Sequence, residues 1–400
     1  MGILDQVFQP IGLRSATTGS SGSSFPFFGA PVTKSGAKVN DKTALTLGAF
    51  YNAVDLCSND IAKLPKAVYQ QVGDQINKLN GHAVHHLISG EPNAYTTPFN
   101  FWKYVSYTAI VKGNGFAFIV RDDATGKPVA LRHLCPTDVT IYKGEDQMYY
   151  RYKGQWIAGS EMIHIYFWSE DGYSGTGVVT YCANALGIAL EGQDFVGNTF
   201  RGTTAGVMET DQQVDPEPKR KLEAGFRAKM SMEGEHKVAL LDEGFKYKNI
   251  NITPAEAQWI ESDNRSIIAI CQFLNVAPHK LKMLDKANYS NLQLMTIEHQ
   301  QDSVMPRTIN IEQELNRKLF TAREKQDHYI KFNLRSQLRG DQKTESEYIT
   351  KLVSWGVMDR NEARKLLELN PREGLGEPLT PVNMQLLKQL VEQENNQGNE

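Results

Sequence analysis

The stretch V-A-P-H-K-L-K-M-L-D-K-A-N-Y, from Val276 to Tyr289, separates two helical patterns and decides the fold of this chain. The first pattern opens at T-P-A-E, Thr253–Glu256, where threonine can cap the helix, proline fits its first position and glutamate can close a capping box. Apolar residues then recur close to the helical period, at Ile260, Ile267, Ile270, Cys271 and Leu274. The sequence therefore predicts a helix over 254–275 that ends before Pro278.

A second helical pattern resumes near Ser290, which with Gln293 makes another possible capping box. Its apolar positions continue to the I-E-Q-E-L-N-R-K-L sequence, at Leu294, Ile297, Val304, Ile309 and Leu315. Pro306 lies inside this run, where it removes one backbone hydrogen bond and crowds the preceding turn. We therefore expect a kinked helix over 291–322.

This order of helix, lysine-bearing loop, N-Y-S-N and kinked helix strongly resembles the portal (head-to-tail connector) proteins of tailed bacteriophages, in the branch found in long-tailed phages. Other segments carry the same resemblance in the family's order. They are F-Y-N-A-V-D-L-C-S-N-D-I-A-K-L-P-K-A-V-Y (50–69), G-N-G-F-A-F-I-V-R (113–121), L-R-H-L-C-P-T-D-V (131–139), E-M-I-H-I (161–165), D-G-Y-S-G (171–175) and G-V-M-D-R-N-E-A-R (356–364). Together they cover roughly residues 45 to 375, and the ordered set is more specific than any single piece.

Length and composition set bounds on the class of protein. Four hundred residues exceed what one hydrophobic core usually serves, so two or three subdomains are expected. Hydrophobic residues make up 40% and charged residues 22%, which is ordinary for a soluble globular protein. The net charge of -3 and the pI near 6.3 argue against wrapping DNA by bulk positive charge, so any nucleic-acid contact must be local.

Cysteine usage and hydropathy indicate a protein made in a reducing cytoplasm, that of a bacterial host in the portal interpretation. Cys57, Cys135, Cys182 and Cys271 are far apart and form no C-x-x-C, so buried free thiols are favoured over disulfides or a metal framework. No apolar run is long enough to span a bilayer, and the first residues lack the pattern of a signal peptide. We therefore expect no contact with a membrane.

From about 45 to 170 the chain alternates between helical and strand-like runs. Helices are predicted at 46–63 and 99–111, and strands at 117–120, 129–134, 139–142, 148–152 and 162–167. Because the strands follow one another too closely for crossover helices, the pattern favours an α+β body with an antiparallel sheet. Before it, the Ser- and Gly-rich residues 1–44 predict a flexible arm.

The later segments alternate in the same way. A helix is predicted from about Gly177 to Asn198, followed by a small module with strands at 206–209, 236–241 and 245–249 and a charged helix at 216–230. Beyond Arg323 the sequence predicts a short strand at 329–334 and helices at 344–354 and 361–369, the last with a capping box at Asp359 and Glu362. The polar end, 386–400, is expected to be disordered.

Several patterns resemble catalytic or metal sites without fulfilling them. The cluster His82, His85 and His86 has no carboxylate at ligand spacing, and a short helix with Ala83, Val84 and Leu87 facing inward explains it better. G-Y-S-G-T-G (172–177) has threonine where a nucleophile elbow needs its last glycine. Walker A and G-x-G-x-x-G sequences are absent, so we expect no enzyme, cofactor or metal, and any packaging motor must be another protein.

The C-terminal helical hairpin leaves a competing interpretation open. Helices on either side of Gly356-Val357-Met358, with Arg360, Arg364 and Lys365, could form a helix-turn-helix of a non-portal DNA-binding protein. Its second helix is short and also carries Glu362 and Glu368, so few groups suit the reading of base edges. An ordinary helical hairpin is the favoured interpretation.

The resemblance implies a portal-type α+β subunit with a mixed α/β wing, a two-helix stem, a small α/β clip, a long kinked helix and a helical crown, assembled in a ring of twelve. Its segments would be an arm 1–44, wing 45–176, stem helix 177–199, clip 200–253, stem helix 254–275, tunnel loop 276–290, kinked wing helix 291–322, crown 323–385 and tail 386–400. The ring would form a channel at the capsid vertex of the virion for DNA packaging and ejection.

Site residues and partners follow from the same resemblance. His279, Lys280, Lys282 and Lys286 would face double-stranded DNA in the channel without regard to sequence, although they can equally be read as solvated charges on a surface turn. Lys219, Arg220, Glu223 and Arg227 of the clip helix would contact partners, or simply be solvated. The partners implied are the terminase large subunit, then head-completion or adaptor proteins of the head-tail connector, and the major capsid and scaffold proteins.

Overall fold

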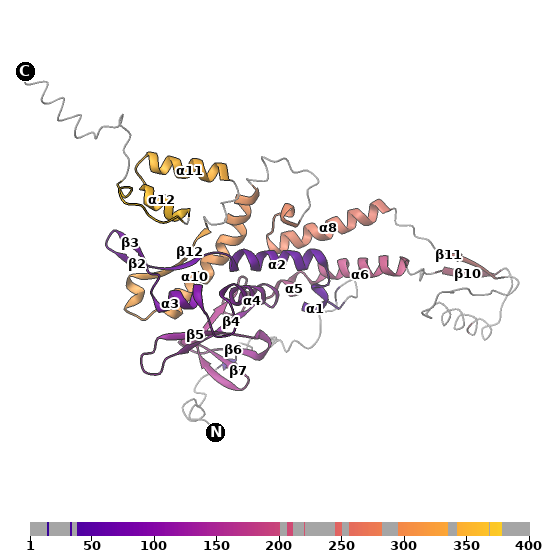
Figure 1. Cartoon of the computed structure of the whole chain (residues 1–400). Helices are drawn as coiled ribbons and strands as arrows, with labels where there is room; N and C mark the ends of the chain where they lie inside the picture. Colours follow the sequence, from indigo (N-terminus) through magenta and orange to yellow (C-terminus); the bar gives the residue numbers. More distant parts are fainter. Residues whose placement is uncertain are drawn as a thin grey trace, which may run out of the picture. The chain divides into compact units, whose positions relative to one another are not determined.

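The structure is a computed structural model. It describes residues 14–15, 33, 38–200, 206–210, 220, 245–249, 256–281, 295–334, 342–367 and 369–377. The chain divides into two compact units, Met1–Asn333 and Leu334–Glu400. Helices and antiparallel strands both build the first unit, which confirms the α+β class (Figure 1).

Two helices, α2 (Gly48–Ala62) and α4 (Pro98–Val111), pack against each other inside the first unit, close to the predicted positions. The α4 helix begins at Thr97, whose Oγ1 accepts a hydrogen bond from the Asn100 amide, and Pro98 supplies a pre-set φ at the first position. The short helix α1 (Asp41–Ala44) precedes α2. It corrects the predicted arm of residues 1–44, because α1 is folded and Ala44 is fully buried.

The strands among the described residues form three antiparallel sheets and one two-stranded ladder. Their orders are β1-β6-β7-β8, β12-β2-β3, β5-β4-β9 and β10-β11. The strands are β1 (Arg14–Ser15), β2 (Lys66–Val72), β3 (Gln75–Lys78), β4 (Gly115–Arg121), β5 (Pro128–Leu134), β6 (Val139–Lys143), β7 (Met148–Tyr152), β8 (Gln155–Ala158), β9 (Met162–Ile165), β10 (Gly206–Thr210), β11 (Phe245–Asn249) and β12 (His328–Phe332). All pairings are antiparallel, as the short spacings predict.

Sequence reasoning missed β2, β3 and β8, and the reason is polarity. β3 (Q-I-N-K) is exposed at every position, and β2 is buried only over its first three residues. β8 pairs with β7 across a turn in which Lys153 and Gly154 both have positive φ, at 47° and 89°. Such a two-residue turn closes a hairpin independently of apolar alternation in the strands.

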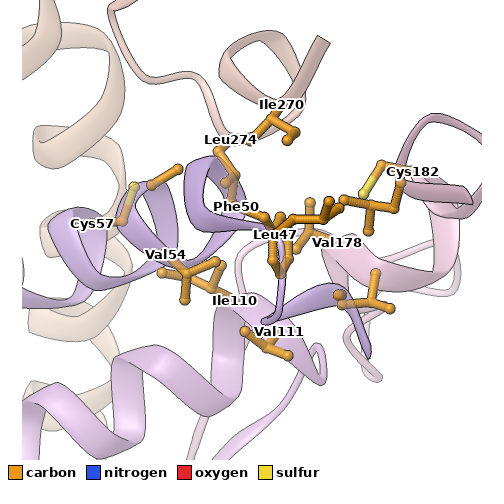
Figure 2. Close-up of a cluster of buried hydrophobic side chains, with 14 of the residues drawn as sticks. Leu47, Phe50, Val54, Cys57, Ile110, Val111, Val178, Cys182, Ile270 and Leu274 are labelled. Atoms are coloured by element: carbon orange, nitrogen blue, oxygen red, sulfur yellow. The ribbon is translucent and has the colours of Figure 1, made fainter. Parts of the chain in front are cut away.

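One large core cluster joins helices that are far apart in the sequence (Figure 2). Phe50 and Val54 come from α2, and Ile110 from the end of α4. Val178 and Leu274 complete it from the two predicted stem helices. Because each of these side chains is 6% exposed or less, the roots of both stem helices are fixed to the same core as α2.

The first predicted stem helix is present but interrupted. It consists of α5 (Val178–Tyr181) and α6 (Ala183–Phe200), with the break at Cys182. The chain enters α5 from a tight crossing: a Cβ at Gly113, which has a φ of 87°, would collide with the Gly175 carbonyl. Only glycine at position 113 permits this approach of backbone to backbone.

The second predicted stem helix is α8 (Glu256–Leu274), which packs beside α6 (Figure 1). Its predicted cap at Thr253 lies outside the described residues. Between the two helices, β10 and β11 form an antiparallel ladder that pairs Gly206 with Asn249 and Thr210 with Phe245. The predicted strands at 206–209 and 245–249 are therefore confirmed, whereas the strand at 236–241 lies outside the described part.

The long helix around Pro306 changes its hydrogen-bond pattern instead of running regularly. A π-helical segment, η6 (His299–Val304), leads directly into α10 (Met305–Leu319), where Pro306 stands at the start. Because proline has no amide hydrogen to donate, the first turn of a new α-helical segment is where it costs least. A π segment thus interrupts the regular α-helical pattern just before the proline, and the kink itself stays a prediction.

After α10 the chain adds one more strand to the first unit before it enters the second. β12 pairs with β2 over five residues, from His328 opposite Gln70 to Phe332 opposite Lys66. The unit boundary therefore falls at Asn333, later than the expected boundary of the helical crown at 323. In the second unit, α11 (Gln342–Ser354) and α12 (Arg360–Leu366) match the predicted helices.

The remaining sequence-based expectations concern cysteines, histidines and membranes. The four cysteines are free, and three are buried, while Cys135 is partly exposed. His82 caps the short helix α3 (Ala83–His85), and the π turn η2 (His86–Gly90) follows it. Val84 and Leu87 are buried as predicted, but Ala83 is exposed, so its predicted inward orientation is wrong. In the described part of the chain, no helix has the length and apolar character needed to cross a bilayer.

Candidate functional site

The lysine-bearing loop starts from a rigid base. Pro278–Leu281 forms a 3-10 turn, η5, in which the Lys280 amide donates to the Ala277 carbonyl at 2.9 Å. Val276 is 4% exposed, and Leu281 packs against the large core cluster. The first predicted loop residues are therefore held against the first unit, and the part of the loop from 282 to 290 lies outside the described residues.

Asn275 turns the chain out of α8. Its φ of 51° lies in the left-handed region, where asparagine is one of the few residues other than glycine found routinely. The next amide, that of Val276, donates to the Cys271 carbonyl at 2.9 Å, and the Asn275 side chain donates to the Asp302 carbonyl at 2.8 Å. The end of α8 is thus joined to the π segment η6.

Arg307 of α10 completes this junction. Its Nη2 donates to the Leu274 carbonyl at 2.6 Å and its Nη1 to Ser303 Oγ at 2.8 Å. The carbonyls of a last helical turn have no partner within the helix and carry partial negative charge, so a guanidinium stabilises them. The guanidinium also lies 5.9 Å from the centre of the Phe167 ring. Arg307 therefore links α8, η6 and the segment that follows β9.

A buried hydrogen bond attaches the same segment to α2. His299 Nε2 lies 2.9 Å from Asp60 Oδ2, and Lys63 Nζ lies 2.6 Å from the other oxygen of that carboxylate. Burial alone would raise the pKa of Asp60, but the hydrogen bonds from His299 and Lys63 outweigh it and lower that pKa. Asp60 is therefore a carboxylate at neutral pH, and it joins α2 to η6.

His279 contributes no positive charge to the loop at neutral pH. Burial lowers its pKa, and the charges of Lys280 and His299 lower it further. Both ring nitrogens are buried without a hydrogen-bond partner among the described residues. Of the four residues predicted for this site, His279 and Lys280 lie at the base, and Lys282 and Lys286 lie outside the described residues.

One of the four residues predicted for the clip surface lies among the described residues. Arg220 is exposed, whereas Lys219, Glu223 and Arg227 lie outside the described residues. The ladder of β10 and β11 positions the two ends of this segment next to each other.

The described histidines do not form a metal site. Within the described ranges, no group of three or more histidine, cysteine or acidic side chains is arranged to hold a metal ion. His82 Nδ1 accepts a hydrogen bond from the Val84 amide at the start of α3. Asp171 likewise accepts from the amides of Tyr173 and Ser174, so the G-Y-S-G sequence forms a turn.

Polar side chains of the C-terminal hairpin form hydrogen bonds within the same segment. Arg364 Nε donates to the Asn370 carbonyl at 2.8 Å, and Asp359 and Glu362 form the predicted capping box. These bonds take up groups that a DNA-reading helix would present to bases.

The phage portal protein family model matches residues 48–368. This chain belongs to the phage portal protein family. Over 351 residues it is 22% identical to the portal protein of Enterobacteria phage HK97, covering 84% of this chain and 82% of that portal. Its fold resembles an HK97-family phage portal protein from Corynebacterium diphtheriae, with a TM-score of 0.59, 18% identity and coverage of 76% and 99%. It also resembles a chain from the neck of a native gene transfer agent particle computed with C12 symmetry, with a TM-score of 0.53, 18% identity and coverage of 83% and 92%.

Because the chain is a portal protein, the base of the loop is the site of interest. Sequence reasoning missed the residues that anchor this base. Asp60, His299 and Arg307 were not singled out, because their partners are distant in the sequence or are backbone carbonyls. Asn275 offered a signal, since asparagine directly after a helical run and before V-A-P is typical of a left-handed helix end.

Proposed function

We propose that twelve copies of this chain close into a ring around a channel through which DNA is packaged and ejected. The observation that carries the proposal is the family match, which spans both predicted stem helices, the loop and the sheets of the wing. A closed ring requires head-to-tail contacts whose rotation returns to the first copy. Portal proteins belong to the virion, at the capsid portal vertex, and this chain takes that place.

We further propose that the loop after Pro278 faces the channel and that Lys280, Lys282 and Lys286 contact DNA phosphates. The anchored base supports this role, because Asn275 and Arg307 fix the point from which the loop starts. Repeated around a ring, the lysines form a collar that attracts phosphates without reading sequence. His279, which is neutral, serves as part of the base.

The remaining segments follow the portal plan as proposals. The wing is 45–176, the stem helices 177–199 and 254–275, the clip 200–253, the tunnel loop 276–290 and the kinked helix 291–322. The crown is 323–385, of which the residues up to Asn333 belong to the first unit. Lys219, Arg220, Glu223 and Arg227 of the clip would meet the terminase large subunit and later head-completion proteins. Major capsid and scaffold proteins would contact the outside of the ring.

Portal proteins are structural, and we propose that this chain has no enzymatic activity of its own. Its contribution to packaging would be a conduit, with ATP hydrolysis supplied by terminase.

Electron microscopy of the purified protein tests the ring. We expect closed annular particles with a central hole, and monomers at all concentrations would reject the proposal. A second experiment tests the loop: K280E, K282E and K286E together should leave rings intact while DNA packaging or retention falls. The matched control replaces three exposed lysines elsewhere, Lys78, Lys127 and Lys331. Normal packaging by the loop variant would reject the assigned role of the lysines.

A further inference from the structure

Five large apolar side chains lie exposed on α5, α6, the end of α8 and the segment between β9 and α5. We call them the α6 band: Trp168 (47% exposed), Tyr181 (41%), Ile188 (57%), Phe195 (43%) and Phe273 (42%). The ring of Tyr181 lies 5.3 Å from that of Trp168 and 6.1 Å from that of Phe273, centre to centre. Ile188 and Phe195 are seven residues apart in α6, which places them on one face two turns apart.

The α6 band is not part of the chain's own core. α6 packs inward through Ala183 and Leu186, which are 7% and 0% exposed and belong to the large core cluster. Leu186 precedes Ile188 by two residues, and two residues turn an α-helix by about 200°. The band therefore lies on the side of α6 that faces away from the core.

We propose that the α6 band is the surface on which the next copy of this chain packs, and that Ile268 of α8 belongs to the complementary surface. The inference rests on the proposed ring and specifies its contact. In a head-to-tail ring each copy uses two different faces, one toward each neighbour. Phe273 of α8 contacts Tyr181, and Ile268, 42% exposed, lies five residues earlier, about 140° around the helix. Ile268 therefore occupies the other flank of α8.

The size of the band suits a stable contact. Large apolar side chains bury roughly 150–250 Å² each when fully covered, so five that are about half exposed offer roughly 400 Å² or more. A stable interface needs roughly 800 Å² from each partner, and its centre is enriched in tryptophan, tyrosine and phenylalanine. The band thus supplies about half of one side, with the composition of an interface centre.

Beside Ile268, one basic residue of α8 can face the acidic side of α6, although α8 as a whole also carries Glu256, Glu261 and Asp263. The described part of α6 carries exposed Glu191 and Asp194 beside the band and no lysine or arginine from 183 to 200. On α8, Arg265 lies one turn before Ile268. Opposite charges at the edge of an apolar contact favour one partner and one register.

Charge introduced into the band tests the proposal. The double variant I188D/F195D should remain a folded monomer, with an unchanged far-UV spectrum and at least tenfold weaker assembly by sedimentation. The control V72D/I76D changes two side chains that are 56% and 59% exposed on the β2–β3 hairpin and should assemble normally. If the native protein forms rings and I188D/F195D forms them equally well, the assignment of this surface is wrong and the portal proposal stands. If the native protein forms no rings, the portal proposal itself fails.

Disulfide trapping identifies the complementary surface without depending on the stability of a charged variant. In a C135S background, which removes the one partly exposed native cysteine, a chain with I188C and another with I268C are mixed and oxidised. Each variant can cross-link to the other only between copies, so a covalent heterodimer is expected. I188C mixed with V72C is the control and should give none. The assignment of Ile268 would be wrong if the proteins form rings visible by microscopy and I188C cross-links to V72C but not to I268C.

Discussion

His299 and Asp60 form a buried pair between segments 239 residues apart in the sequence, with 2.9 Å between Nε2 and Oδ2 and exposed fractions of 2% and 5% for the two side chains. Asp60 lies near the end of α2, and His299 begins the π segment beside the loop base. Since Asn275 and Arg307 attach α8 to the same π segment, a displacement of the loop base is transmitted to α2.

D60N should therefore destabilise the protein and loosen the loop base. Removing one partner of a buried, hydrogen-bonded pair costs about 3 kcal/mol or more. The control is D55N, which removes an ion pair to Lys103 in which the side chains are 31% and 36% exposed, and should cost about 1 kcal/mol or less. Urea unfolding at pH 7.5 measures both. Equal costs for the two variants would show that the Asp60–His299 pair stabilises no more than a surface contact.

R307M should increase the mobility of the loop base and lower the free energy of unfolding less than D60N does. The variant keeps the length of the side chain but leaves the Leu274 carbonyl without its donor, which costs about 1.5–3 kcal/mol for a charged hydrogen bond. Hydrogen exchange of the amides of Val276 and Lys280 measures the local effect, with R323M, at an exposed arginine after α10, as the control. Unchanged exchange in R307M would contradict the anchoring role.

Lys66 should make stability depend on pH in the alkaline range. Burial lowers the pKa of Lys66 to about 7, while its Nζ donates to the Ala62 and Leu64 carbonyls. The unfolded chain, with an ordinary lysine pKa near 10.5, then binds more protons than the folded chain between pH 7 and 10.5, so stability rises with pH by about 1.4 kcal/mol per unit. This slope should be absent in K66M and present in K331M, whose lysine is exposed. Urea midpoints at pH 7.5, 8.5 and 9.5 measure it, and identical slopes would contradict the prediction.

The elements that could be predicted are those whose pattern is local. α2, α4, α8 and the β4–β5 pair follow from apolar periodicity, a capping residue or a Gly-Lys-Pro turn. β3 could not be predicted because all its residues are exposed, and it forms through pairing with β2. The π segment likewise depends on tertiary contacts, since its His299 is buried against Asp60.

The same distinction between local pattern and tertiary contact applies to the candidate site. The position of the loop was predictable from V-A-P and the helices on either side. Its anchoring was not, because Arg307 bonds to a backbone carbonyl, which carries no sequence signal. The neutral state of His279 also needed the structure, since burial causes it.

His164 should make the protein sensitive to acid. Its Nε2–H donates to Asn114 Oδ1 at 2.8 Å, and its Nδ1 lies 3.2 Å from the Tyr150 hydroxyl, so the ring is neutral and fully engaged. Burial lowers the pKa of His164 to about 3, with the charges of Lys318 and Arg317 adding to the effect. The unfolded chain, with a histidine pKa near 6.5, then binds the extra proton between pH 6.5 and 3, so stability falls by about 1.4 kcal/mol per unit as the pH decreases through this window.

H164Q tests this, because glutamine can keep a donor toward Asn114 but does not titrate. The variant should be less stable than the native protein at pH 7.5, where the loss of ring packing on Phe116 dominates, and the difference should narrow toward pH 5. Urea unfolding at pH 7.5, 6.0 and 5.0 measures both proteins, with H86Q, at an exposed histidine, as the control. A difference that stays constant across these pH values would show that His164 takes up its proton in the folded protein as readily as in the unfolded chain.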